Sequence, residues 1–200
     1  MKYIKIKNEI ILASKSRVRK EILEKNKIRC KVITSNIDED PIKQSLLREG
    51  APPETISKNL AEIKATKVSV MHKNELVLGA DSVIDLQNTI ISKPKNRIEA
   101  LQILIKLNGK KHNLISSASI CKNGSMVWNH TDKAKLTMKN FTEDELKKYL
   151  KKIPDEKLFA YNVYQIEGEG RKLFSKIEGD ENTIMGLPVD KIKEYLENHE

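Results

Sequence analysis

The stretch that decides the fold is Leu76-Val77-Leu78-Gly79-Ala80-Asp81-Ser82. Its apolar run lies inside a strand predicted over residues 75–84, and small residues separate that run from the acid. Small residues before an acid let another group approach the backbone closely. A carboxylate at the end of such a strand, where the strand opens into a crevice, is well placed to hold Mg²⁺. The local sequence fits equally well a strand-terminal Asp81 that only makes a turn.

A strand, a serine-rich turn and a helix lie on the N-terminal side of this stretch. The strand is predicted over residues 10–13, and Ser16 is a good N-cap for the helix after it. Backbone N–H groups at a helix start form a natural anion site, to which Ser14, Arg17 and Arg19 add hydroxyl and guanidinium donors. This set of donors suits a triphosphate. The alternative is an ordinary capped helix with solvated cations, and the turn taken alone favours it.

The remaining elements indicate a mixed sheet flanked by helices. Further strands are predicted over residues 31–37, over residues 113–122 and 125–137 around an Asn123-Gly124 hairpin turn, and near Tyr164 and Phe174. Helices are predicted over residues 55–72, after Asn96 as far as Gly109, from the capping box at Thr142 to Lys152, and after Pro188. Strands and helices alternate early and a hairpin lies in the middle, so we predict an α/β fold with a mixed, elongated sheet. We expect a single domain over residues 1–200, with two lobes around a cleft.

The composition indicates a soluble protein that attracts anions. The chain has 200 residues, 38% hydrophobic and 32% charged, with a formal net charge of +9. Its basic residues are spread along the chain rather than gathered in a patch, which argues against nucleic acid as a partner. The two cysteines and four histidines lack metal-ligand spacing, which argues against a zinc site. The apolar run ending at Leu12 is too short for a signal peptide or a membrane span, so we predict a cytoplasmic protein without a membrane partner.

Three other segments carry side chains that suit phosphate chemistry. The acidic turn Asp38-Glu39-Asp40 follows a predicted strand, and it is either solvated or one half of a carboxylate pair that would favour Mg²⁺. Lys64 lies at the edge of the apolar arc of its helix, so its side chain either extends to solvent or reaches into a cleft. Lys93 precedes the turn-forming Pro94 and is either a surface lysine or a phosphate contact. Gln165 is uninformative on its own.

Eight segments, taken together and in order, resemble the Maf family of nucleotide pyrophosphatases. Each segment is a weak signal alone, but the set spans nearly the whole chain. The segments are residues 12–19, 36–39, 60–65, 78–82, 92–94, 107–112, 164–168 and 177–188. The resemblance implies a fold similar to that of inosine triphosphatase-type enzymes, with an extended mixed sheet, surrounding helices and a cleft between two lobes.

The resemblance also implies an activity and the residues that carry it. The reaction is cleavage of the α–β phosphoanhydride of a nucleoside triphosphate, which yields a nucleoside monophosphate and pyrophosphate, and the substrates include modified nucleotides. The acid that matches Asp81 is the family's proton acceptor, and Ser82 follows it where the family often has threonine. The residues carried over to this chain are Ser14, Arg19, Glu39, Lys64, Asp81, Lys93 and Gln165.

The chemistry of Asp81 adds a divalent metal to this picture. A free aspartate, with a pKa of about 3.9, is a poor base toward bulk water, whereas Mg²⁺ or Mn²⁺ lowers the pKa of a bound water. We therefore expect Asp81 to orient or deprotonate a metal-associated water while Glu39 helps to hold the metal. Lys64, Lys93 and Arg19 are expected to neutralise charge that grows on the departing pyrophosphate.

Two departures from the family pattern bear on the identity of the base. Arg17-Val18-Arg19 stands where the commonest family turn has Pro-Arg-Arg, and Asn162-Val163 stands where the family usually has Gly-Ala or Gly-Gly. The family further implies a homodimer. A nucleotide- or nucleic-acid-binding regulator of cell division is the alternative function, and an inosine triphosphatase-like enzyme is a third. The intact set of acids and lysines favours catalysis, and the turn at residues 12–16 argues against the third.

Overall fold

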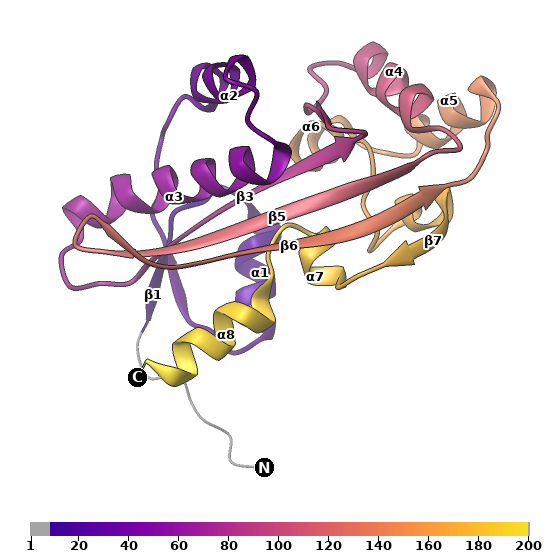
Figure 1. The fold of residues 1–200 in the computed structure, drawn as a ribbon. Coiled ribbons are helices and arrows are strands. Elements are labelled where there is room, and N and C mark those ends of the chain that lie inside the picture. Colours follow the sequence, from indigo (N-terminus) through magenta and orange to yellow (C-terminus); the bar gives the residue numbers. More distant parts are fainter. Residues whose placement is uncertain (1–8, 200) are drawn as a thin grey trace.

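The strands form one seven-stranded mixed sheet in the part of the chain that the structure describes. The computed structural model describes residues 9–199, so the first eight residues and the last residue of the predicted domain lie outside the described residues. The strands are β1 (Ile10–Leu12), β2 (Cys30–Val32), β3 (Val77–Leu86), β4 (Thr89–Ile91), β5 (Lys111–Lys122), β6 (Ser125–Met138) and β7 (Phe174–Glu178). Their order is β2-β1-β3-β5-β6-β7, and β4 pairs with β3 off this path (Figure 1).

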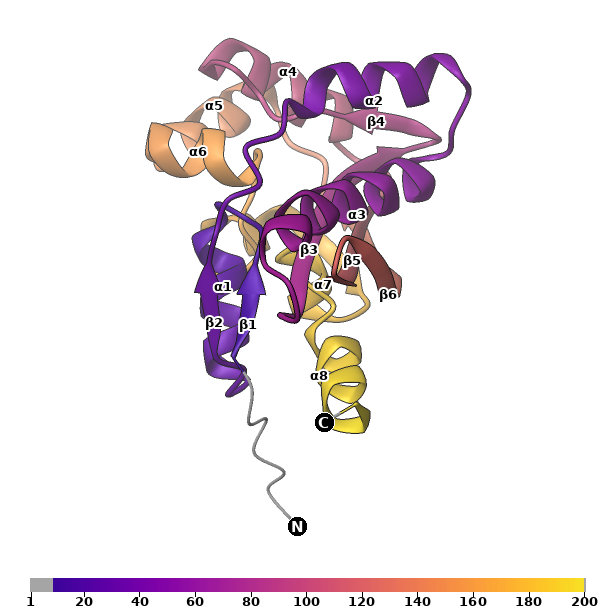
Figure 2. The same ribbon diagram turned by 90° about the vertical axis from the view of Figure 1, so that its left-hand side faces the viewer.

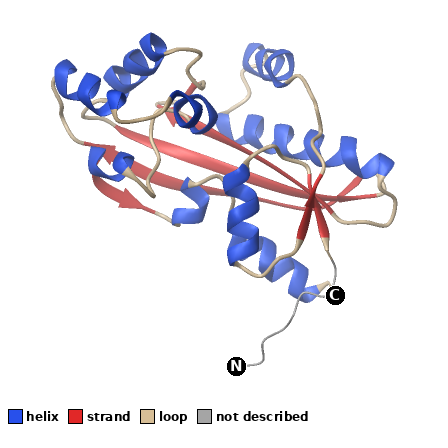
Figure 3. Cartoon of the chain, turned by 180° about the vertical axis from the view of Figure 1, so that it is seen from behind, coloured by secondary structure: helices blue, strands red, loops and turns tan. Residues whose placement is uncertain are grey.

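The sheet combines parallel and antiparallel pairs, as predicted. Strand β1 runs parallel to both β2 and β3, and all other neighbouring pairs are antiparallel. The long strands β3, β5 and β6 cross the whole molecule and carry helices on both sides (Figure 3). The helices are α1 (Arg17–Lys25), α2 (Glu39–Arg48), α3 (Pro53–Met71), α4 (Arg97–Leu107), α5 (Glu143–Lys151), α6 (Asp155–Tyr161), the 3₁₀ helix η1 (Glu169–Leu173), α7 (Glu181–Ile184) and α8 (Val189–Asn198).

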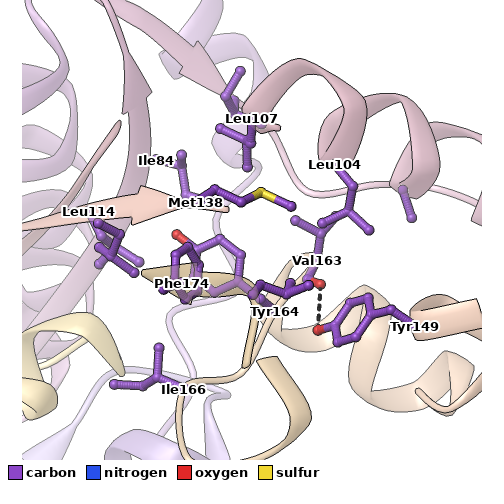
Figure 4. Packing of buried hydrophobic residues seen from close by; sticks show 14 of the residues in the cluster. Ile84, Leu104, Leu107, Leu114, Met138, Tyr149, Val163, Tyr164, Ile166 and Phe174 are labelled. Carbon is purple, nitrogen blue, oxygen red and sulfur yellow. Dashed lines mark hydrogen bonds between the residues drawn. The ribbon is translucent and has the colours of Figure 1, made fainter. Parts of the chain in front are cut away.

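Separate apolar cores at the two ends of the sheet make the two lobes. At one end, β1 alternates: Ile10 and Leu12 pack toward α1 and α8, whereas Ile11 packs toward α3. At the other end, buried residues of α4, α5 and α6 pack on β5, β6 and β7, as Figure 4 shows for that cluster. Strand β3 contributes Leu78 to the first core and Ile84 to the second. This continuity supports the proposal of a single domain over residues 1–200.

Local sequence signals account for most of the element boundaries. Ser16 caps α1 by accepting a hydrogen bond from the backbone N–H of Arg19, and Thr142 forms the predicted capping box with Glu145. Asn123 and Gly124 both have positive φ angles, of 53° and 81°, as a two-residue hairpin turn of type I′ requires. No helix among the described residues is long and apolar enough to cross a membrane.

Three predicted elements were wrong or incomplete. The strand predicted over residues 31–37 ends at Val32, and the acidic turn that follows is the start of α2 rather than an isolated turn. Asp38 caps this helix by accepting a hydrogen bond from the backbone N–H of Asp40. Glu39 and Asp40 lie in the first turn, where the helix dipole favours negative charge. The strand predicted near Tyr164 is absent, since that segment is an irregular loop between α6 and η1. The three-residue strand β4 was not predicted.

A buried histidine lies behind this irregular loop. His112 of β5 is 2% exposed, and its Nε2 lies 2.9 Å from the hydroxyl of Tyr164, while its Nδ1 has no hydrogen-bond partner among the described residues. Burial lowers the pKa of His112 from 6.5 to about 4, although the charge of Asp85 opposes this effect. The imidazole ring of His112 is therefore neutral in the native state near neutral pH.

We expect this histidine to make the protein sensitive to acid. The folded-state pKa is below the unfolded one, so the associated stability is fully present above pH 6.5 and is lost as the pH falls toward 4. Between pH 7 and pH 4.5 the wild type should lose about 2 kcal/mol more of its unfolding free energy than His112→Gln, whose side chain does not titrate. Urea unfolding of both proteins at the two pH values measures this difference. Equal losses in the two proteins would contradict the assignment.

Candidate active site

A cleft of about 1130 Å³ opens between the two lobes. One wall consists of the turn between β1 and α1, helices α2 and α3, and the middle of β3, while the other consists of the loop after β4 and the irregular loop near Tyr164. Figure 2 shows α2 above α3 on one side of the molecule, with β4 close to α2. All ten residues that the sequence singled out as site residues line this cleft: Ser14, Ser16, Arg17, Arg19, Glu39, Lys64, Asp81, Ser82, Lys93 and Gln165.

Lys64 joins the two acids that the sequence could not bring together. It is 6% exposed and extends from α3 into the cleft rather than toward solvent. Its Nζ donates to Oδ1 of Asp81 at 2.8 Å and lies 3.0 Å from Oε1 of Glu39. The carboxylates thus come from different elements, β3 and α2, but meet on one ammonium group. An ordinary surface turn does not explain such an arrangement.

The environment of Asp81 makes its carboxylate a better base than a free aspartate. Asp81 is 7% exposed, and burial raises the pKa of its carboxyl above the usual value, while the charges of Lys64 and Arg19 act in the opposite direction. A raised pKa increases the affinity of the carboxylate for a proton taken from water. The direct ion pair with Lys64 favours the ionised form that a proton acceptor needs.

Arg19 is largely occupied by the protein itself. Its Nε donates to the carbonyl of Gly186 at 2.9 Å, and its Nη1 donates to the carbonyl of Ala80 at 2.9 Å and to Oγ of Ser14 at 3.1 Å. Its Nη2 donates to Oγ of Ser82 at 3.1 Å. A guanidinium group has five N–H donors, so these four bonds use most of them. Arg19 therefore fixes the backbone next to Asp81 and supplies positive charge to the site. It has few N–H donors left to bind a phosphate.

The serine-rich turn places its donors in different ways. Ser14 is buried and accepts from both Arg19 and the N–H of Ser16, while Ser16 caps α1. Arg17 lies at the rim of the cleft with its side chain 83% exposed, and its Nε is 2.8 Å from Glu21 on the outside of the helix. Arg17 thus forms an ordinary i,i+4 ion pair here, on the outer face of the helix start.

The opposite wall contains the second departure from the family pattern. Asn162 lines the cleft with φ 76° and ψ −170°, a backbone conformation that is essentially restricted to glycine. Its side-chain Oδ1 accepts a hydrogen bond from the N–H of Val163 at 3.0 Å. This geometry explains why glycine is the usual family residue at the position, and it means that the asparagine carries strain of about 1–3 kcal/mol at the cleft wall.

Two cleft residues were missed by the sequence interpretation. Lys43 lies one helical turn after Glu39, but the segment was predicted as a turn, so their i,i+4 spacing on one helix face was not recognised. Tyr164 was predicted on a strand, whereas it lies in an irregular loop next to the cleft, its ring packs against His112 and Phe174, and its hydroxyl bonds to His112. The helical spacing of Glu39 and Lys43 is the signal that could have revealed the first of them.

The mixed sheet and a cleft in which a buried aspartate and a second carboxylate meet lysines define a candidate enzyme that acts on phosphate groups. A family model described as "Maf-like protein" matches residues 9–199, and the chain belongs to this family. The chain is 68% identical over 188 residues to a "Nucleoside triphosphate pyrophosphatase" of Pelagibacter ubique, a match that covers 94% of this chain and 96% of that protein.

Two further comparisons place the chain among more distant proteins. It is 36% identical over 181 residues to a "7-methyl-GTP pyrophosphatase" of Rhizobium etli, covering 90% of this chain and 91% of that protein. The solved structure of the Staphylococcus aureus Ham1 protein covers 96% of this chain and 100% of its own, with 16% identity and a TM-score of 0.42.

Proposed function

We propose that this chain hydrolyses the α–β phosphoanhydride of a nucleoside triphosphate, releasing a nucleoside monophosphate and pyrophosphate, and that modified nucleotides are among its substrates. The observation that carries the proposal is the cluster in the cleft in which the buried pair Asp81 and Lys64 meets the more exposed carboxylate of Glu39. Membership of the Maf-like family and the names of its relatives support the same reaction. In a site that only binds an anion, the Asp81 carboxylate would repel the phosphates, so its presence in the cleft favours catalysis over simple binding.

The chemistry of the step assigns a role to each group. A water oxygen forms a bond to one phosphorus atom of the linkage, and the bridging P–O bond breaks. Asp81 accepts the proton that the water loses, and Lys64 holds the Asp81 carboxylate in place. Lys93, Lys64 and the charge of Arg19 offset the negative charge that grows on the departing pyrophosphate. Ser14, Ser16, Arg17, Ser82 and Gln165 are proposed to bind or orient the substrate around this centre.

The donor set of the cleft fits a hard divalent cation bound together with substrate. Within residues 9–199 no group of three histidine, cysteine, aspartate or glutamate side chains could hold a metal by itself. Mg²⁺ commonly uses only one or two carboxylates plus substrate phosphates, and Asp81 and Glu39 offer such a pair. When bound, Mg²⁺ or Mn²⁺ supplies charge neutralisation and a water of lowered pKa.

We further propose a cytoplasmic location and a homodimer. Cys30 and Cys121 are both free thiols, which is consistent with a reducing compartment. The homodimer rests on the family resemblance. The nucleoside triphosphate is the proposed partner of the cleft, and the dispersed basic residues argue against nucleic acid.

A product assay with the purified protein tests the reaction. The protein is incubated with a panel of normal nucleotides and modified ones, including 7-methyl-GTP, with Mg²⁺ or Mn²⁺, and the products are separated by ion exchange. We expect monophosphate and pyrophosphate in equal amounts, with turnover lost when the metal is chelated. Nucleoside diphosphate and orthophosphate as products would exclude the proposed bond. A complete lack of turnover over the panel would instead favour a nucleotide-binding regulator.

A further inference from the structure

Lys43 forms a polar contact across the mouth of the cleft. It extends from α2, one turn after Glu39, and its Nζ donates to Oγ of Ser92 at 2.9 Å. Ser92 belongs to the loop after β4 and directly precedes Lys93, so this bond ties α2 to the opposite wall. The packing of α2, which has no buried residue, does not explain this contact.

The ammonium group of Lys43 has spare capacity for an anion. Within the described part of the chain, Lys43 forms no ion pair within 4.0 Å. Its hydrogen bond to the neutral hydroxyl of Ser92 uses one of the three N–H donors of the ammonium group. Lys64, by contrast, is already in contact with two carboxylates. Burial lowers the pKa of Lys43, while Asp81, Asp40 and Glu39 raise it, which places the ammonium within the field of the reaction centre.

The lining of the cleft includes both cationic and apolar side chains. Apolar and aromatic side chains, among them Leu114, Tyr164 and Ile166, line the part built from β5 and the irregular loop, and they suit a nucleobase and its sugar. Lys43 and Lys93 are among the cationic lining residues, and the bond from Lys43 to Ser92 holds Lys43 against the loop that carries Lys93. In a nucleotide whose α–β linkage lies at Asp81, the terminal phosphates extend away from the base, and these lysines offer them cationic partners.

We infer that Lys43 is a substrate-binding residue that contacts the terminal phosphates of the nucleotide, and hence the pyrophosphate that leaves, an inference that rests on the proposed pyrophosphatase activity. In the substrate complex the Lys43 ammonium gives up or shares its bond to Ser92 and donates to phosphate oxygens. The contact between Lys43 and the phosphate oxygens also holds α2 over the departing pyrophosphate. Lys43 thereby favours triphosphates over diphosphates, which lack the outermost phosphate.

Product inhibition separates this role from a general effect of charge. Lys43→Gln should weaken competitive inhibition by inorganic pyrophosphate about tenfold and raise KM for the triphosphate by a similar factor, while inhibition by the nucleoside monophosphate stays unchanged. Lys43→Arg keeps the positive charge and should restore most of the pyrophosphate affinity. Arg48→Gln is the matched control, because it removes one positive charge from an exposed position of the same helix outside the cleft.

The outcomes decide the inference independently of the proposed reaction. Unchanged pyrophosphate inhibition in Lys43→Gln, or equal weakening in Lys43→Gln and Arg48→Gln, would overturn the role of Lys43. Calorimetric titration of pyrophosphate with Mg²⁺ into the wild type, Lys43→Gln and Arg48→Gln tests the contact without turnover. If the wild type binds pyrophosphate but cleaves no triphosphate, the proposed reaction fails while the test of Lys43 still stands. Loss of pyrophosphate binding in Lys43→Gln but not in Arg48→Gln supports the role of Lys43.

Discussion

Asp81→Asn is expected to lower turnover by about a thousandfold while the protein remains folded. The amide has almost the shape of the carboxylate but cannot accept the proton of the attacking water, and loss of a general base costs about 10²–10⁴ in rate. Folding should survive because Glu39 stays 3.0 Å from Lys64 Nζ, so the buried ammonium keeps a partner. Initial rates at saturating nucleotide, together with a thermal melt followed by circular dichroism, measure both effects.

Asp85→Asn is the matched control for this variant. Asp85 lies on the same strand and is 4% exposed, but its carboxylate accepts from the N–H of Asn88 and from the side chain of Asn113, away from the cleft. We expect Asp85→Asn to keep turnover within a few fold of the wild type. Turnover of Asp81→Asn near the wild-type rate would show that another group accepts the proton.

The parts of the site that the sequence predicted depend on regular elements. Residues 75–84 read as a buried strand, and the periodicity of residues 55–72 placed Lys64 at the edge of an apolar face. Both elements are present, as β3 and α3, and their direct packing brings Lys64 to Asp81. A strand-end acid and a helix-edge lysine are local properties, so a single sequence contains enough information to identify them.

The parts that the sequence missed depend on contacts between distant segments. Helix α2 begins within the acidic segment that was predicted as a turn, and the pairing of Glu39 with Lys64 joins α2 to α3, so it could not be foreseen from either segment alone. The four internal bonds of Arg19 reach segments as far away as Gly186, which no local pattern encodes. Tyr164 looked like a strand residue because aromatic residues favour strands, but its hydroxyl and ring are satisfied by His112 and Phe174.

Gly79→Ala is expected to destabilise the protein by about 3 kcal/mol, because it forces α3 away from the sheet. A Cβ atom at Gly79 would overlap the carbonyl oxygen of Ala61 and lie 2.8 Å from the backbone N of Ala65. Both are backbone atoms of α3, so no side-chain rotation relieves the clash and the helix itself must move. A loss of that size lowers the melting temperature by about 6–12 °C in a chain of this length.

Activity should fall together with stability in this variant, since α3 carries Lys64. A helix displaced from β3 lengthens the 2.8 Å bond between Lys64 and Asp81, and errors of this kind at a reaction centre cost large factors in rate. Gly168→Ala provides the control: a Cβ there meets nothing within 4 Å, so its melting temperature should stay within about 2 °C of the wild type. A Gly79→Ala protein with wild-type melting and turnover would mean that close contact between α3 and β3 does not position Lys64.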